Sequence, residues 1–360
     1  MKKIKAWLKL LSVNGIGKAT AIKIAKTLGE PYSFIYEDTS LLDNISIISD
    51  SAKEKIINKE PESLENTLEI IEKNEIKFIS ILDSEYPESL KNIYDPPPFL
   101  FYKGSLKKDW FRRIIAIVGT RKPTAYGVMM TKKICDNLCM NKFTIVSGLA
   151  YGIDSMSHQT ALTNKSPTFA VLGTSVDKIY PPRNEGLAKR IIETGAVISE
   201  KVPGIKTDKW SFPERNRIIS GLSSGVVVIE GSKKSGSLIT AKFALDQNRD
   251  IFALPGNITQ KEAEGPNYLI KLGAQIITSP QDIAESYNLL GLGDNSSFPE
   301  LNNKEEKAYQ IIKIGNGETS FDKLLVKTGF SFGELSSIIL SLELKNIIKK
   351  SIGNKFIALY

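Results

Sequence analysis

The sequence predicts an α/β protein whose central sheet is doubly wound and mostly parallel. Two observations carry this prediction. Short, nearly continuous apolar runs recur through the middle of the chain, as strands buried on both faces require. Helix-like stretches separate the runs, which is the alternation of a parallel sheet. The predicted strands are residues 114–119, 143–148, 168–173, 196–200, 225–230, 250–256 and 274–278, and the predicted helices are 125–140, 153–164, 184–193, 214–222, 237–247 and 265–272.

Helical segments and a connector precede this core. In residues 1–65, Gly15-Ile16-Gly17 lies between two apolar helical faces, which is typical of a helix-hairpin-helix of the SAM-like kind. Such a turn either accepts a backbone phosphate through its free amides or only packs a small domain. Pro96, Pro97 and Pro98 exclude a helix, so residues 66–105 are expected to form an extended connector.

The α/β core is expected to span residues 106–287, and a linker and a third domain follow it. Gly, Asn and Ser dominate residues 288–303, which predicts the linker. Residues 304–360 show three helical segments, near 304–314, 320–328 and 331–344, and two short strands around Gly353 and Asn354. Three helices and a terminal hairpin outline a winged-helix domain, a fold that binds duplex DNA or contacts proteins.

Composition narrows the class of protein. The 360 residues are 41% hydrophobic and 24% charged, as in a globular chain with a substantial core. There is no run of eighteen apolar residues and no signal-peptide cleavage pattern, so we expect no membrane partner. Two cysteines exclude a disulfide scaffold and fit the cytoplasm. Residues 106–285 carry 25 Lys and Arg against 16 Asp and Glu, whereas the remainder carries 23 against 24. That excess indicates an anionic partner for the core, unless it serves solubility alone.

The first predicted strand ends in IAIVGTRKPTAYG, a glycine-led loop that enters a helix. A dinucleotide fold would have G-x-G-x-x-G here, but only Gly119 is in place. Gly119, Thr120 and the cation Arg121 remain at the end of the strand. Together with the backbone amides, these groups predict a phosphate-binding loop.

A second small-residue loop, IVSGLAYGIDSMSHQTAL, follows the next strand. Ser147 and Gly148 close that strand, and Gly152 permits a close backbone approach before a helix. We expect Asp154 to cap that helix rather than to act in catalysis. His158, the only histidine, has no partner constellation in the sequence and is expected to be packed.

The third loop lies in FPERNRIISGLSSGVVVIEGSKKSGSLITAKFALDQ. Lys234 precedes Ser235, Gly236 and Ser237 at a predicted helix start, where free amides and the helix dipole favour an anion. The carboxyl ends of parallel strands gather at one edge of a sheet, so the three loops should converge there. The helix before this loop adds polar side chains to the candidate set: Arg215, Asn216 and Arg217.

The usual signatures of catalysis are absent from the sequence. Cys135 and Cys139 have i, i+4 spacing, which favours core packing, and no metal cluster can be assembled around His158. No nucleophile-elbow, zinc-protease or P-loop motif occurs. Glu230 is the best isolated carboxylate, but the sequence offers it no partner. We therefore expect a binding protein that is not an enzyme and has no cofactor and no metal.

The core motifs resemble the DprA/Smf family of bacterial DNA-processing proteins over about 180 residues. The similarity lies, in order, in GTRKPTAYG, SGLAYGIDSMSHQTAL, AVLGTSVDKIYPPRN, FPERNRIISGLSSGVVVIEGSKKSGSLITAKFALDQNRDIFALPG and GPNYLIKLGAQIITSPQDI. The resemblance implies an extended Rossmann fold and a homodimer. It also implies a protein that binds and protects incoming single-stranded DNA, and that loads the RecA recombinase during natural transformation or recombination.

Mapped residue by residue, the resemblance places the arginine of the DNA pocket at Arg121 and its lysine at Lys234. Gly119 and Thr120 would be the small neighbours, with Ser147, Gly148 and the Ser235–Ser237 turn beside them. Phosphate capture would dominate over base recognition. Nearby aromatic side chains could also stack on bases. The candidates for stacking are Tyr126, Tyr151 and Phe212.

Two other functions remain open. A nucleotide-processing Rossmann enzyme of the nucleoside-phosphate phosphoribohydrolase type also binds phosphate at strand ends. Its P-G-G-x-G-T-x-x-E signature has no match, since the equivalent stretch here is EGSKKSGSLITA. The other alternative is a scaffold that docks a recombinase and whose positive charge is incidental.

Overall fold

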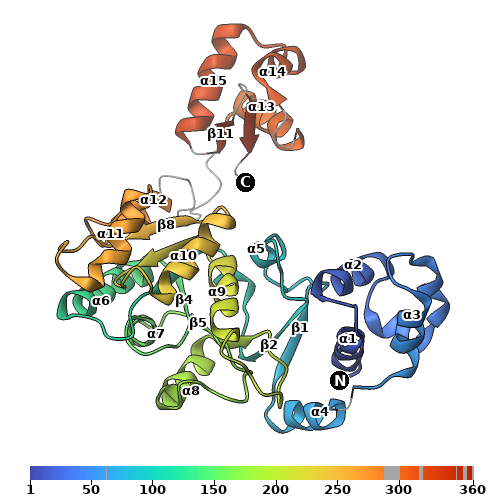
Figure 1. The fold of residues 1–360 in the computed structure, drawn as a ribbon. Coiled ribbons are helices and arrows are strands. Elements are labelled where there is room, and N and C mark those ends of the chain that lie inside the picture. The colour runs from blue at the N-terminus through green and yellow to red at the C-terminus, as the bar shows by residue number, and fades with distance from the viewer. Residues whose placement is uncertain (62, 288–300, 316–318, 346, 352–354, 359–360) are drawn as a thin grey trace. The chain divides into compact units, whose positions relative to one another are not determined.

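The computed structural model describes residues 1–61, 63–287, 301–315, 319–345, 347–351 and 355–358. Contacts divide the chain into two compact units, residues 1–281 and residues 282–360. The larger unit contains a nine-stranded sheet, and the smaller one contains helices and a three-stranded sheet (Figure 1).

The central sheet is mostly parallel, as predicted. Its strand order is β1-β2-β6-β5-β4-β3-β7-β8-β9, and every pair from β6 to β9 is parallel. Every residue of β3 to β7 is buried, which means that both faces of the sheet are covered. The strands are β1 (Lys77–Ser80), β2 (Phe99–Gly104), β3 (Ile114–Val118), β4 (Thr144–Ser147), β5 (Thr168–Val171), β6 (Ala196–Ser199), β7 (Gly225–Val228), β8 (Asp250–Ala253) and β9 (Gln275–Ile276).

Helices connect the parallel strands close to their predicted positions. From β3 the chain proceeds outward through β4, β5 and β6, and then returns to the other side of β3 with β7. This reversal makes β3 and β7 the topological switch point, where a crevice opens outside the carboxyl ends of the strands. The helices are α6 (Ala125–Met140), α7 (Ile153–Thr163), α8 (Glu185–Thr194), α9 (Ser211–Leu222), α10 (Gly236–Asp246) and α11 (Glu264–Lys271).

The N-terminal helical segment is part of the larger unit. Gly15 has a φ of 94°, which only glycine adopts easily, and the chain turns there between the first two helices. Trp7 is fully buried and packs edge-on against Phe99 of β2, with ring centroids 6.2 Å apart. The hydrophobic core is therefore continuous from this segment into the sheet. The helices here are α1 (Lys2–Ser12), α2 (Lys18–Leu28), α3 (Asp50–Asn58) and α4 (Leu64–Lys73).

The expected extended connector over residues 66–105 is wrong for most of its length. That stretch contains most of α4, the strands β1 and β2, and the short helix α5 (Glu88–Lys91). The strand β2 pairs antiparallel with β6, with Phe101 opposite Ser199. The pairing joins segments almost a hundred residues apart, so no local sequence pattern predicts it. The three prolines restrict the backbone only at their own positions and at the residues just before them.

Along its described residues, the smaller unit has the element order two helices, a strand, two helices, and two strands. Its core includes Tyr309, Leu324 and Leu342. The predicted linker, residues 288–303, falls almost entirely outside the described residues, as does the Gly353–Asn354 turn. The elements are α12 (Asp282–Tyr287), α13 (Asn303–Ile314), β10 (Thr319–Ser320), α14 (Phe321–Thr328), α15 (Phe332–Leu344), β11 (Ile348–Ser351) and β12 (Lys355–Ala358).

No single described helix has both the length and the apolar composition that a membrane span needs. Among the described helices, only the bent pair α14 and α15 meets both requirements when its two helices are taken together.

Candidate functional site

A cavity of about 800 Å³ opens at the topological switch point. The loop after β3, the loop after β7 and the first turns of α9 form most of its wall. Of the described residues that line it, five have cationic side chains and two have carboxylates, which favours an anion. The cationic residues are Arg121, Lys122, Lys209, Arg215 and Lys261, and the acidic ones are Asp154 and Glu262.

The loop after β3 is held from behind while its cations face outward. A Cβ on Gly119 would lie 2.6 Å from Ile153 Cγ1, so only glycine allows this close packing. The Thr120 amide donates to the Glu230 carbonyl oxygen at 2.7 Å. Arg121 and Lys122 are exposed and line the cavity. The loop therefore presents two positive charges from a fixed backbone.

The loop after β7 supplies a helix N-terminus. Ser235 caps α10 by accepting a hydrogen bond from the Ser237 amide at 3.3 Å. A Cβ on Gly236 would meet nothing within 4 Å, so the backbone at the start of the helix is open to the cavity. The positive end of the α10 dipole and these amides favour a negatively charged group.

The helix α9 contributes Arg215 and Asn216. Arg215 is buried, and its Nη1 donates to the Gly148 carbonyl oxygen at 2.7 Å and to the Val171 carbonyl oxygen. Burial lowers the pKa of Arg215 to about 10, with Asp154 opposing the shift and Arg121 adding to it. Arg215 therefore braces the cavity wall and contributes its charge from within it.

Asp154 does not cap its helix, contrary to the prediction. The N-cap of α7 is Gly152, and the Asp154 carboxylate accepts hydrogen bonds from the amides of Gly148 and Ala150 in the preceding loop. Burial raises the pKa of this carboxyl group, and Arg215 opposes that shift. Asp154 therefore stabilises the loop after β4 and partly balances Arg215.

Most of the predicted binding residues meet at the cavity. Arg217, Ser147 and Lys234 do not. Arg217 points away from it, into an ion-pair network described below, and the Ser147 hydroxyl donates to the Ile117 carbonyl oxygen inside the core. Lys234 is exposed next to Ser235 without lining the wall. Gly148 lines a small side pocket that Arg215 also lines. The predicted residues that line the cavity are Gly119, Thr120, Arg121, Phe212, Arg215, Asn216, Ser235, Gly236 and Ser237.

The three predicted stacking residues lie in different places. Phe212 lines the cavity and packs on Tyr180, with ring centroids 5.2 Å apart at 57°. Tyr151 lines only the side pocket. The Tyr126 hydroxyl donates to the Pro255 carbonyl oxygen at 3.1 Å, away from the cavity. Phe212 is thus the one of the three whose ring faces the cavity itself.

Sequence reasoning missed several lining residues, among them Lys122, Lys209, Tyr180 and Lys261. Lys209 precedes the predicted start of α9, and its nearness to Phe212 was a usable signal. Tyr180 and Lys261 come from loops after β5 and β8, and nothing local marks them as part of this site. Their contribution depends on how the loops converge in space.

The remaining titratable candidates have structural partners. The Glu230 carboxylate accepts hydrogen bonds from the amide and hydroxyl of Thr124. His158 is fully buried with Nδ1 2.7 Å from Thr168 Oγ1, and burial lowers its pKa to about 3. Cys135 and Cys139 are buried in α6, as expected from their spacing. Within the described ranges, no three His, Cys, Asp or Glu side chains are grouped to hold a metal ion.

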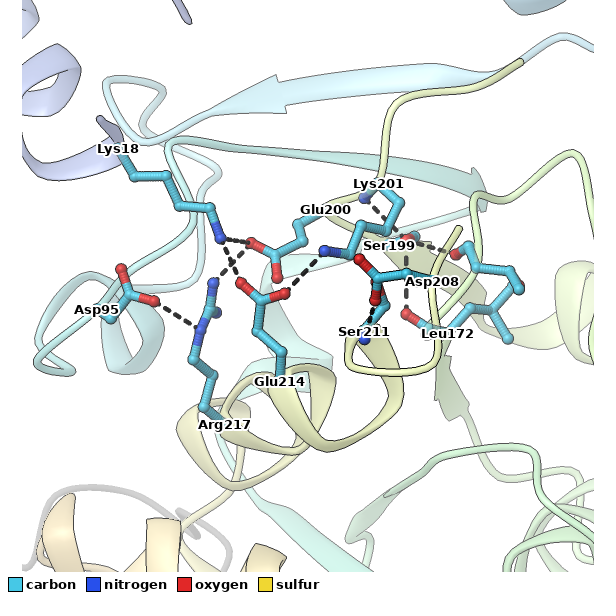
Figure 2. A network of polar contacts seen from close by, with 11 residues as sticks. Lys18, Asp95, Leu172, Ser199, Glu200, Lys201, Asp208, Ser211, Glu214 and Arg217 are labelled. Carbon is cyan, nitrogen blue, oxygen red and sulfur yellow. Dashed lines mark hydrogen bonds and ion pairs between the residues drawn. The ribbon is translucent and has the colours of Figure 1, made fainter. Parts of the chain in front are cut away.

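An ion-pair network lies on the other side of α9, where Arg217 is found (Figure 2). Arg217 Nη2 lies 2.6 Å from Glu200 Oε2, and its Nε lies 2.9 Å from Asp95 Oδ2. Lys18 of α2 and Lys201 approach Glu214 from two sides, at 2.8 Å each. The network joins α9 to the N-terminal segment.

Comparison with known proteins gives consistent matches. The family model described as DNA recombination-mediator protein A matches residues 77–288. DNA processing protein DprA of Bacillus subtilis is 47% identical over 210 residues, which is 58% of this chain and 71% of that protein.

Two solved structures are similar to this chain. The X-ray structure of DNA processing protein A from Streptococcus pneumoniae has 34% sequence identity and a TM-score of 0.61, covering 79% of this chain and 97% of that one. DNA processing protein A from Helicobacter pylori has 30% identity and a TM-score of 0.53, covering 59% and 96%, and its structure concerns the single-stranded DNA binding mode of that protein.

Proposed function

This chain belongs to the DprA/Smf family, and on that premise we propose that it binds single-stranded DNA in the cavity at the topological switch point. It protects the incoming strand and passes it to the RecA recombinase in natural transformation or recombination. The family's description as a recombination mediator supports the second step, and the single-stranded DNA binding of the Helicobacter pylori relative supports the first.

The observation that carries the proposal is the convergence of cations and free amides on one cavity. The loop after β3 contributes Arg121 and Lys122. Arg215 comes from α9 and Lys209 from the residues just before that helix, while Gly236 lies at the start of α10. Arginine and lysine side chains recognise phosphate by charge, and backbone amides add hydrogen bonds without sequence preference. A polyanionic strand fits this arrangement better than a neutral ligand.

The cavity also offers one place for a base. Phe212 packs on Tyr180 at the wall, and a base that stacks on such a ring gains about 1–3 kcal/mol whatever its identity. Phosphate contacts therefore position the strand in the cavity, and stacking adds affinity that does not depend on base sequence. Binding is expected to tolerate any base composition.

The test compares the affinities of the wild type and Arg121→Ala for a fluorescent oligothymidylate, measured by fluorescence anisotropy. We expect the Kd to rise more than about tenfold, since Arg121 brings a full charge to the cavity rim. Arg190→Ala is the matched control, because it removes the same charge from α8, outside the cavity lining, and should leave the Kd within about twofold. Equal affinities for the wild type and Arg121→Ala would refute the proposal.

Lys234→Ala separates the contribution of a lysine charge in the loop after β7 from that of the loop's backbone amides. Lys234 is exposed beside the capping Ser235 and lies outside the cavity lining. We propose that it contacts a phosphate as the strand leaves the cavity. Its removal should then weaken binding less than the removal of Arg121.

The nucleotide-processing alternative has less support. Asp154, a carboxylate that lines the cavity, is buried against Arg215 and accepts hydrogen bonds from loop amides. Glu230 is engaged by Thr124. Incubation of purified protein with nucleoside monophosphates should release no free base, and turnover would favour the enzyme.

The remaining parts of the proposal concern assembly and location. We propose a cytoplasmic homodimer without catalytic activity, with residues 304–360 as a winged-helix domain. The order of helices and strands in the smaller unit supports that assignment. Light scattering of the purified chain would measure its oligomeric state.

A further inference from the structure

The helical hairpin at the N-terminus directs a lysine towards the core. Lys18 is the first residue of α2, directly after Gly17. Its Nζ lies 2.9 Å from Glu200 Oε2 and 2.8 Å from Glu214 Oε1 (Figure 2). Its ammonium group is therefore shared between a carboxylate that follows β6 and one in the first turn of α9.

Further ion pairs brace this contact. Glu200 is almost fully buried and also pairs with Arg217 of α9, while Lys201 pairs with the second oxygen of Glu214. Asp95 approaches Arg217 from the loop before β2. These ion pairs join three cations to three carboxylates, so their charges balance only while Lys18 is present.

The same helix forms the cavity wall. Glu214 faces the network, while the next two residues, Arg215 and Asn216, line the cavity. Consecutive helical residues point about 100° apart, so one short helix serves both sides. Asn216 Nδ2 also lies 3.4 Å from the Gly236 carbonyl oxygen at the start of α10. A shift of α9 would therefore move two walls of the cavity.

We propose that Lys18 is a positioning residue for DNA binding, which fixes the first turns of α9 and thereby the placement of Arg215 and Asn216 in the cavity. The inference rests on the function proposed above. It assigns the N-terminal hairpin a task other than direct contact with DNA, because its turn lysine is committed to the core.

The energetics of the network favour this role. Glu200 and Arg217 each expose only about 5% of their side chains. Because water screens their charges poorly, removing a neighbouring charge leaves them unbalanced at a substantial cost in free energy. Burial opposes ionisation of Glu214, yet hydrogen bonds from Lys18 and Lys201 lower its pKa to about 2. Without Lys18, the carboxylates of Glu200 and Glu214 would repel each other across the space that its ammonium occupies.

The experiment compares Lys18→Met with Lys23→Met in the full chain. Lys23 is an exposed lysine of the same helix, so its removal changes the net charge equally. The Kd for oligothymidylate is measured at several salt concentrations. Lys18→Met should raise the Kd about three- to tenfold with the wild-type salt slope, and Lys23→Met should leave the Kd within about twofold. Lys18→Arg should restore binding, since it keeps the charge and both carboxylate contacts.

Two outcomes would overturn the inference. Wild-type affinity in Lys18→Met is the first. The second is a loss of affinity accompanied by a decrease of about 0.7 in the magnitude of the salt slope, because that is the signature of a lost phosphate contact. Glu214→Gln serves if Lys18→Met unfolds: it removes the negative charge that α9 presents to Lys18 while keeping the size of the side chain, and should weaken binding with the slope unchanged. Wild-type affinity in Glu214→Gln would also overturn the inference.

Arg121→Ala, measured alongside, separates this inference from the proposed function. If Arg121→Ala loses affinity while Lys18→Met does not, the inference is wrong and the proposed function stands. If Arg121→Ala keeps wild-type affinity, the cavity is not the binding site, and the proposed function is overturned together with the inference.

Discussion

The buried carboxylate of Glu230 accepts two hydrogen bonds from Thr124, one from the backbone amide at 2.9 Å and one from the hydroxyl. Glu230 lies just beyond β7, and Thr124 is the N-cap of α6 at the end of the loop after β3. The two loops that frame the cavity are thus joined by one side-chain pair.

Gly127→Ala should destabilise the protein through Glu230. An alanine Cβ at position 127 would lie 2.8 Å from Glu230 Oε1 and closer still to the rest of the carboxylate. Moving the carboxylate leaves the half-buried Thr124 amide unpaired, which costs about 1–3 kcal/mol. Urea unfolding should report that loss in the free energy of unfolding. In Gly186→Ala, a helical position with nothing within 4 Å, the free energy of unfolding should stay within about 1 kcal/mol. Equal stabilities of the two variants would contradict the prediction.

Gly148→Ala should disturb the cavity itself. The added Cβ would lie 2.5–2.6 Å from the guanidinium of Arg215, which is buried and cannot easily yield. We expect a loss of about 1–3 kcal/mol in the free energy of unfolding and a Kd for single strands raised at least about tenfold. Gly236→Ala lines the same cavity with open space around its Cβ, and should keep wild-type stability. A Gly148→Ala protein that binds normally would show that Arg215 does not need this position.

The affinity for single strands should depend on salt in proportion to the phosphates engaged. If about four phosphates are bound per protomer, the slope of log affinity against log salt should be near −3, from about −0.7 for each phosphate. Anisotropy titrations between low and moderate salt would measure it. Arg121→Ala should reduce the magnitude of the slope by about 0.7, and a wild-type slope near zero would argue against capture through the phosphates.

Stability should fall with pH below about 6.5 because of His158. Burial holds the pKa of the folded His158 near 3, against 6.5 in an unfolded chain, with Arg215 adding to the shift. Between those values the unfolded state takes up a proton that the folded state does not. The stability present above pH 6.5 is therefore lost as pH falls, by at most about 1.4 kcal/mol per unit.

Urea unfolding at pH 7.5, 6.5 and 5.5 measures this loss above the pKa range of ordinary carboxyl groups. NMR provides a direct check, because the chain has a single histidine. The His158 ring resonances should not shift between pH 8 and pH 5. A titration centred near pH 6.5 would show that the ring reaches solvent.

Local pattern was sufficient for the parallel part of the fold. The strands β3 to β7 are short, fully buried apolar runs, and a run of that kind indicates a buried strand without information from distant residues. The antiparallel pair β1 and β2 was missed because its stability comes from β6, far along the chain. An interaction of that kind has no signal in a window of ten residues.

The cavity was predictable from the strand ends, but the direction of each side chain was not. Arg215, Asn216 and Arg217 were grouped because they are adjacent in sequence. On a helix they point about 100° apart, and the third turns to Glu200 and Asp95 instead. Lys261, by contrast, was not predicted but lines the cavity, because it lies on a loop that carries no recognisable motif.

The antiparallel pair also has a practical consequence for shortening the chain. If residues before 106 were removed, the backbone donors and acceptors along one side of β6 would lose their partners, and a fully buried apolar strand would become an open edge. Such a fragment would be prone to edge-to-edge aggregation. The α/β core predicted over residues 106–287 therefore depends on a strand that precedes it.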